Sequence, residues 1–178
     1  MAYVHDPDGY LVEFVQQDGV RPGVVDPAEV AQDGDVVSIL ASYCIYVSDM
    51  DNSVEFWRDV IGIEYQFSTD LGQIKEVVLQ SPHGGSRIQL AQKLDDDSPI
   101  DMGNAMWKLY VNTSDCKDLY DRAIAAGATS VMEPARLDRW PVTMAFVQDR
   151  DGYLVEFVEY HDGTNPGVPD PKELAATS

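Results

Sequence analysis

The chain contains a nine-residue stretch twice, and this internal repeat constrains its fold more than any other feature of the sequence. The second copy runs from Asp149 to Phe157 (DRDGYLVEF), and the first copy runs from Asp6 to Phe14 (DPDGYLVEF). The match continues upstream, where residues 1–4 (MAYV) correspond to residues 144–147 (MAFV). Self-similarity at a fixed spacing indicates a repeated structural unit. We therefore interpret the chain as the end of one unit followed by one whole unit.

Each copy predicts a β-hairpin, because Asp-Gly is a strong signal for a two-residue turn in which Gly takes a positive φ. In the second copy, strands are expected over residues 143–148 and 153–159, which are rich in aromatic and β-branched residues. Period-2 alternation places Glu156 on the face opposite Val155 and Phe157. Glu156 is then either exposed on an edge strand, as carboxylates usually are, or directed into a pocket.

Composition restricts the class of protein. At 178 residues the chain suits one domain of ordinary size. A formal net charge of −19, from 31 acidic and 12 basic residues, argues against nucleic acid or an anionic membrane as a partner. The two cysteines, Cys44 and Cys116, form no spaced framework, so reduced thiols and a cytoplasmic location are expected. The sequence shows neither a signal peptide nor an apolar run of about 18 residues.

From residue 36 the predicted elements follow the order βαβββ twice. The first half is expected to contain a strand over residues 36–47, a helix over 52–60 and strands over 63–68, 74–80 and 87–92. The second half is expected to contain a strand over 105–111, a helix over 114–126 and strands over 130–132, 143–148 and 153–159. The predicted domain thus spans 36–161, with modules over 36–93 and 104–161, an N-terminal arm and linker over 1–35, and a tail over 162–178. A loop over 133–141 is long enough either to be mobile or to line a pocket.

Two motifs resemble the vicinal oxygen chelate superfamily, which includes glyoxalase I, bleomycin-resistance proteins, fosfomycin-resistance enzymes and extradiol dioxygenases. The first is residues 43–49 (YCIYVSD) leading into 53–62 (SVEFWRDVIG), and the second is residues 146–156 (FVQDRDGYLVE). Together they cover roughly residues 36–160. The resemblance implies an α+β fold of paired βαβββ modules that form a cup-shaped mixed sheet, here with an extra N-terminal β-hairpin arm.

In metal-using members of that family four ligands line the cup. Carried over by position, they fall on Ser42, Gln89, Met106 and Glu156, and only Glu156 keeps the family's residue type. A hydroxyl and a thioether are poor ligands for magnesium, manganese or zinc. No cofactor is therefore expected. A divalent metal bound by Gln89 and Glu156 remains the alternative. The three histidines, His5, His83 and His161, lie in turns or flanking segments and not at the expected ligand positions.

The favoured function is that of a glyoxalase/bleomycin-resistance-like protein that binds a small organic molecule without metal. The expected ligand-binding residues are Ser42, Tyr46, Gln89, Met106, Lys108, Trp140 and Glu156. The alternative is an enzyme, either a metal-dependent lyase, isomerase or dioxygenase, or a metal-free variant with Glu156 as the catalytic base. Core packing is the competing interpretation for Tyr46 and Trp140. Lys108 is interpreted as an exposed edge lysine in preference to a partner for Glu156.

The N-terminal copy has three interpretations. It belongs to a longer tandem protein, or it docks on a sheet edge of its own chain, or it docks on the edge of a partner, since a lone hairpin is only marginally stable. We expect a homodimer to which this arm contributes.

Overall fold

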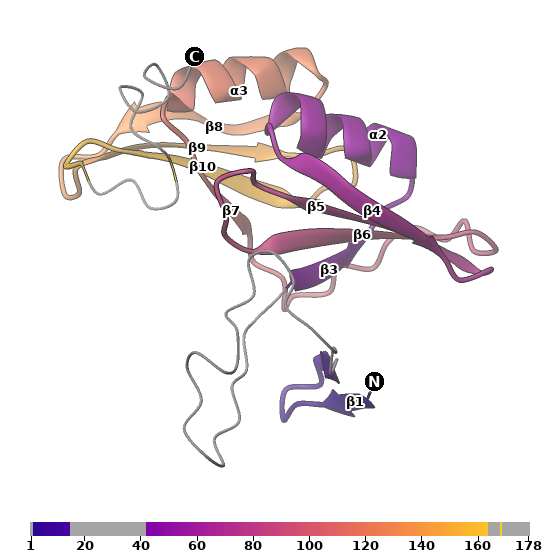
Figure 1. The fold of residues 1–178 in the computed structure, drawn as a ribbon. Coiled ribbons are helices and arrows are strands. Elements are labelled where there is room, and N and C mark those ends of the chain that lie inside the picture. Colours follow the sequence, from indigo (N-terminus) through magenta and orange to yellow (C-terminus); the bar gives the residue numbers. More distant parts are fainter. Residues whose placement is uncertain (1, 15–41, 164–167, 169–178) are drawn as a thin grey trace. The chain divides into compact units, whose positions relative to one another are not determined.

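The computed structural model describes residues 2–14, 42–163 and 168 (Figure 1). The chain divides into two compact units, residues 1–39 and residues 40–178. Three predicted segments lie wholly or partly outside the described residues: residues 15–35 of the predicted arm and linker, the first part of the strand predicted over 36–47, and most of the predicted tail.

The first unit contains the predicted hairpin. Strand β1 (Ala2–His5) pairs antiparallel with β2 (Leu11–Phe14), and every residue of both strands is exposed. The turn is organised by Asp6, whose carboxylate oxygen Oδ1 accepts from the backbone N–H groups of Asp8 (3.0 Å) and Tyr10 (2.8 Å).

The same turn recurs in the second copy of the repeat. The carboxylate oxygen Oδ1 of Asp149 accepts from the N–H groups of Asp151 (3.0 Å) and Tyr153 (2.9 Å). Gly152 has a φ of +90° there, and Gly9 has a φ of +91° in the first copy. The predicted positive φ at Gly is confirmed, but the two-residue turn is wrong. Five residues separate the strands, because the aspartate side chain at the start of the turn binds the backbone and closes a wider loop.

The second unit contains two four-stranded mixed sheets, as the α+β prediction required. One sheet has the order β3-β6-β5-β4, and the other has the order β7-β10-β9-β8. The strands of the first sheet are β3 (Ser42–Tyr46), β4 (Glu64–Asp70), β5 (Ile74–Gln80) and β6 (Arg87–Lys93). Those of the second are β7 (Leu109–Asn112), β8 (Thr129–Arg136), β9 (Val142–Gln148) and β10 (Leu154–Tyr160). The sheets are open, and each begins with a strand that pairs in parallel with the last strand of its module.

Each module has one helix after its first strand. Helix α2 (Met50–Glu55) starts at Asp49, whose side chain accepts from Asn52 N–H, and it continues as the π-helical turn η1 (Phe56–Val60). Helix α3 (Cys116–Ala125) is capped in the same way by Asp115. Both helices cover the same side of the two sheets (Figure 1).

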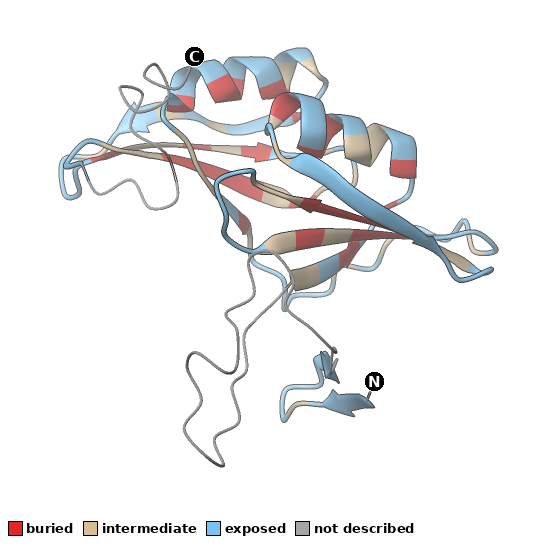
Figure 2. Cartoon of the chain, viewed as in Figure 1, coloured by how far each residue is buried: buried red, intermediate tan, exposed pale blue. Residues whose placement is uncertain are grey.

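One hydrophobic core joins the two modules beneath these helices. Leu79 and Leu90 of the first sheet and Val155 and Phe157 of the second are fully buried in it. Buried positions run along the central strands of both sheets and along the helices, whereas β4 is exposed along its whole length (Figure 2). The face of each sheet turned away from the helices is therefore separate from this core.

Polar contacts also tie the modules together. The Asp151 carboxylate accepts from both the N–H group and the hydroxyl of Ser48, and the Tyr153 hydroxyl donates to the Tyr46 carbonyl oxygen at 2.8 Å. The repeated turn thus holds the start of the first helix as well as joining β9 to β10.

Two predicted boundaries in the second module are wrong. The strand predicted over 105–111 begins only at Leu109. Before it, the Gly103 N–H group donates to the Asp101 carboxylate at 2.9 Å in a turn, and residues 105–107 are exposed. Strand β8 runs to Arg136 instead of ending at residue 132, so the predicted pocket loop shrinks to residues 137–141. A proline is disfavoured inside a helix or a central strand, so Pro134 favoured an early end of this strand. However, β8 is an edge strand, and its register shift between Met132 and Ala135 accommodates the proline.

Candidate functional site

Glu156 occupies the middle of the second sheet. Its strand β10 lies between β7 and β9, and Glu156 stands opposite Tyr110 on one side and Phe146 on the other. Only 1% of Glu156 is exposed. The predicted alternation is confirmed, since the neighbours Val155 and Phe157 enter the core on the helix side. The exposed interpretation of Glu156 is wrong, because the strand carrying it is central and not an edge.

The carboxylate of Glu156 forms an ion pair with the ammonium group of Lys108. The Lys108 side chain is 18% exposed and that of Glu156 is 2% exposed, so Lys108 is the more exposed member of the pair. The Glu156 oxygen Oε2 receives no well-directed hydrogen bond, so the contact is one of charge. The preferred prediction of an exposed edge lysine is therefore wrong, and the pairing alternative is confirmed.

Three aromatic rings surround the same ammonium group. The Nζ atom of Lys108 lies 4.2 Å from the ring centre of Trp107, 5.2 Å from that of Tyr110 and 5.7 Å from that of Phe146. These distances are within the range of cation–π attraction. The carboxylate and the ring faces together hold Lys108 in one place.

The hydroxyl of Tyr110 lies 3.5 Å from the hydroxyl of Tyr160. Burial, this hydrogen bond and the nearby Glu156 carboxylate all raise the pKa of Tyr110. The phenol of Tyr110 therefore stays neutral at physiological pH and can donate or accept a hydrogen bond beside the ion pair.

The other predicted site residues occupy different surroundings. Gln89 stands between Cys44 and Val78 in the first sheet, on the face away from the core, and Ser42 pairs with Arg87 at the start of the same sheet. Met106 is exposed in the segment before β7.

Tyr46 and Trp140 make their aromatic contacts elsewhere. The Lys93 ammonium lies 5.2 Å from the Tyr46 ring centre, and the Arg139 guanidinium lies 5.0 Å from the Trp140 ring centre. Both rings are about half exposed, at 45% and 54%, so core packing does not account for them. Lys108 and Glu156 are the predicted residues that the structure brings into direct contact.

Comparison with known families and structures decides the family. Residues 39–157 match the family described as Glyoxalase/Bleomycin resistance protein/Dioxygenase superfamily. The chain belongs to this superfamily. Among named relatives, it is 24% identical over 120 residues to a lactoylglutathione lyase from Neisseria meningitidis, which covers 66% of this chain and 87% of the relative. A probable lactoylglutathione lyase from Synechocystis is 25% identical over 119 residues, or 65% of this chain and 90% of that protein.

Solved structures of the superfamily share the fold. A glyoxalase I mutant (V278E) from Zea mays superposes with a TM-score of 0.70 at 20% identity, covering 88% of this chain and 53% of the maize chain. The chain therefore spans about half the length of that protein. A glyoxalase family protein from Bacillus cereus superposes with a TM-score of 0.61 at 20% identity and covers 72% of this chain and 98% of that chain. Within the described part of the chain, no helix is long and apolar enough to cross a membrane.

The residues that the resemblance assigns to the superfamily's metal positions are poor ligands for a divalent ion. Ser42 offers a neutral hydroxyl, Gln89 an amide and Met106 a thioether, which is too soft a donor for magnesium, manganese or zinc. The remaining position, Glu156, already carries the Lys108 ammonium on its carboxylate. In residues 2–14, 42–163 and 168 no cluster of three His, Cys, Asp or Glu side chains could hold an ion instead.

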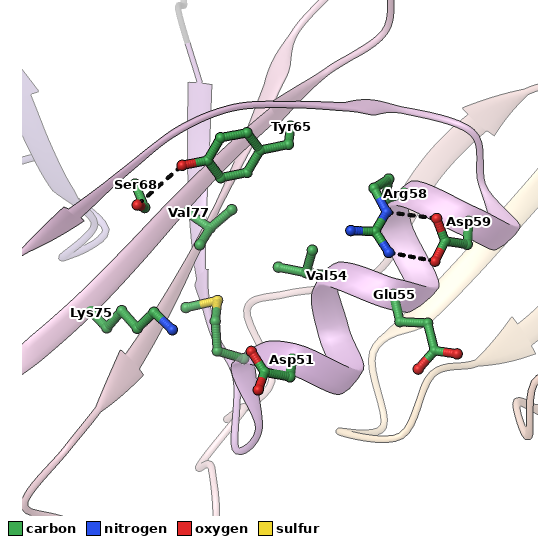
Figure 3. A pocket seen from close by; sticks show the side chains of 10 residues that line it. Asp51, Val54, Glu55, Arg58, Asp59, Tyr65, Ser68, Lys75 and Val77 are labelled. Carbon is green, nitrogen blue, oxygen red and sulfur yellow. Dashed lines mark hydrogen bonds and ion pairs between the residues drawn. The ribbon is translucent and has the colours of Figure 1, made fainter.

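A separate groove lies on the helix side of the first sheet (Figure 3). It encloses about 560 Å³ between α2, η1 and strands β4 and β5. Its walls carry an Arg58–Asp59 ion pair at 2.6 Å and a hydrogen bond from the Tyr65 hydroxyl to the Ser68 hydroxyl at 3.1 Å. None of the predicted site residues lines this groove, which faces the opposite side of its sheet from Gln89.

Sequence reasoning missed Trp107, Tyr110 and Phe146. A usable signal for Phe146 alone was present in the repeat, since residue 3 corresponds to residue 146 and Glu13 to Glu156. In the first copy the Tyr3 hydroxyl donates to the Glu13 carboxylate at 3.0 Å, across the strands. Once the register of the hairpin is known, the sequence therefore gives the residue that lies opposite the site carboxylate on the neighbouring strand.

Proposed function

We propose that this protein binds a small organic molecule at the Lys108–Glu156 pair and does so without a divalent metal. The observation that carries this proposal is the ion pair itself: a protein ammonium takes the place on the carboxylate of Glu156 that a metal ion would need. A metal would have to displace a tethered cation and then find its other donors among a hydroxyl, an amide and a thioether.

Exposure supports a ligand that meets Lys108 first. The Glu156 side chain is 2% exposed, whereas Lys108 is 18% exposed and its neighbours Trp107 and Tyr110 are 75% and 49% exposed. Lys108, Trp107 and Tyr110 thus offer solvent-exposed surface to a ligand. Small-molecule sites combine apolar or aromatic walls with a few polar groups in this way.

In this proposal the predicted residues have distinct roles. Lys108 is the polar contact, and Glu156 holds it in position. Ser42, Gln89 and Met106 provide further contacts from the superfamily's ligand positions, and Tyr46 and Trp140 contribute exposed aromatic surface.

An enzymatic function is the second proposal, because the curated relatives are named lactoylglutathione lyase. In a metal-free reaction Glu156 would act as the base that removes a substrate proton, and Lys108 would stabilise the negative charge that develops. For that role Lys108 must move aside, since it covers the carboxylate.

The binding proposal is tested by thermal-shift screening of a panel of small aromatic compounds against protein treated with a chelator. A compound that binds the folded state raises the unfolding temperature. Stabilisation should survive chelation and disappear in Lys108→Met, while Lys117→Met, which changes an exposed lysine on α3, should behave as wild type. Stabilisation that requires an added divalent ion refutes the metal-free proposal.

We also propose a cytoplasmic homodimer to which the N-terminal hairpin contributes. The hairpin exposes Val12 (37%) and Phe14 (56%), whereas their counterparts Val155 and Phe157 are fully buried in the second sheet. A partner chain would cover this apolar surface. Light scattering of a variant lacking residues 1–30 should give the monomer mass, and an unchanged dimer would rule the arm out as the contact.

A further inference from the structure

We propose that the ligand is a neutral, planar aromatic compound carrying a carbonyl oxygen, and that the Lys108 ammonium donates a hydrogen bond to this oxygen. This inference rests on the binding function proposed above. It follows from the hydrogen-bonding capacity of Lys108, from the charge of the pair and from the exposed rings around it.

The ammonium group of Lys108 has donors to spare. A lysine ammonium carries three N–H groups and no acceptor. The Glu156 carboxylate holds the ammonium by charge without a well-directed hydrogen bond, and 18% of the Lys108 side chain is exposed to solvent, so we assign N–H groups of the ammonium to the ligand. A ligand oxygen can replace water on these donors at little cost, and a hydrogen bond from a charged donor is stronger than one from a neutral donor.

The charge of the site disfavours an anionic ligand. Lys108 and Glu156 neutralise each other, so the pair offers no net positive charge. The chain as a whole carries −19 and repels anions at a distance. A carbonyl oxygen accepts the same hydrogen bond without bringing a charge into this field.

A cationic ligand is disfavoured for a different reason. The carboxylate and the faces of Trp107, Tyr110 and Phe146 form a good site for an ammonium group, but Lys108 already occupies it. A free amine must compete with a tethered one, whose effective concentration is in the millimolar range or above. The site is thus closed to dissolved cations while Lys108 is present.

The rings determine the shape of the rest of the ligand. Trp107 and Tyr110 flank the ammonium and are 75% and 49% exposed, which is unusual for residues of this size next to a buried ion pair. A flat aromatic ligand can stack on these rings while its carbonyl group reaches Lys108. The structure therefore selects a planar compound over a branched aliphatic one.

The experiment compares four naphthalene probes that differ in one substituent: 2-acetylnaphthalene, 2-ethylnaphthalene, 2-naphthoate and 2-naphthylmethylammonium. Dissociation constants are measured by quenching of protein fluorescence for wild type, Lys108→Met and the control Lys117→Met. The ketone should bind wild type about 10- to 100-fold more tightly than the hydrocarbon, the range expected for a hydrogen bond from a charged donor. This preference should vanish in Lys108→Met and persist in Lys117→Met. Circular dichroism spectra of all three proteins establish that they are folded.

Each other outcome is decisive. Equal binding of the ketone and the hydrocarbon overturns the carbonyl assignment but leaves a binding site. Tightest binding of the naphthoate or of the naphthylmethylammonium overturns it in favour of an anionic or a cationic ligand, respectively. Binding of none of the probes to wild type overturns the assignment of an aromatic ligand, and the wider thermal-shift panel then decides the proposed function separately.

Discussion

Replacing Lys108 by Met should destabilise the protein strongly, because it leaves the Glu156 carboxylate buried without a partner. Met keeps the unbranched stem that packs beside Trp107 and Phe146 and removes only the charge. Removing one member of a buried pair costs about 3–5 kcal/mol. The 18% exposure of Lys108 allows water to reach the site partially, so about 3 kcal/mol is expected. Against a total stability of about 5–15 kcal/mol, this loss is easily measured.

The assay is urea unfolding of wild type, Lys108→Met, Glu156→Gln and the double variant, followed by circular dichroism. In the Glu156→Gln background no buried charge remains, so the further change of Lys108 to Met should cost less than about 1 kcal/mol. The resulting coupling energy between the two residues should be about 2 kcal/mol or more. An equal cost of Lys108→Met in both backgrounds, or a cost below about 1 kcal/mol for Lys108→Met alone, would show that the ion pair does not stabilise the fold in this way.

Three further changes test the repeated turn and the contact between modules. Burial raises the pKa of Asp149 to about 6, so ionising this side chain between about pH 4 and pH 7 destabilises the folded wild type. Over that pH range the unfolding free energy of Asp149→Asn should therefore rise by about 2–3 kcal/mol relative to that of wild type. A difference between the two proteins that does not change with pH contradicts this. Gly152→Ala should cost about 1–2 kcal/mol in thermal unfolding because of its φ of +90°, whereas Gly9→Ala, at +91° in the separate hairpin unit, should leave the main transition unchanged. Asp151→Ala should cost about 1–3 kcal/mol through the lost hydrogen bonds to Ser48, and a loss below about 0.5 kcal/mol shows that they contribute little.

The sequence predicted the order of elements because each signal for it is local. The hairpin turn shows this most clearly, since Asp6 and Asp149 make the same two backbone hydrogen bonds in two different units. The alternation in β10 was also predictable, because Val155 and Phe157 alternate with Glu156 in the sequence itself. Strand ends were not, as the extension of β8 through Pro134 depends on its position at the edge of the sheet.

The candidate site was predictable only as a set of positions. The superfamily resemblance pointed to Glu156, but the burial of this residue depends on β7 and β9 lying on either side of it. The pairing with Lys108 depends on where β7 begins, since Lys108 is the residue immediately before that strand. A contact between residues 108 and 156, which are 48 positions apart in sequence, is not visible in local patterns.

The metal content of the protein distinguishes a Lys108–Glu156 ion pair from a metal site in one measurement. Wild-type protein purified without added chelator is analysed for nickel, zinc, manganese and iron by inductively coupled plasma mass spectrometry. We expect far less than one metal ion per chain, and in particular no metal that is lost on changing Glu156 to Gln. Stoichiometric metal that disappears in Glu156→Gln would contradict it, because the carboxylate would then be a metal ligand and not the partner of Lys108.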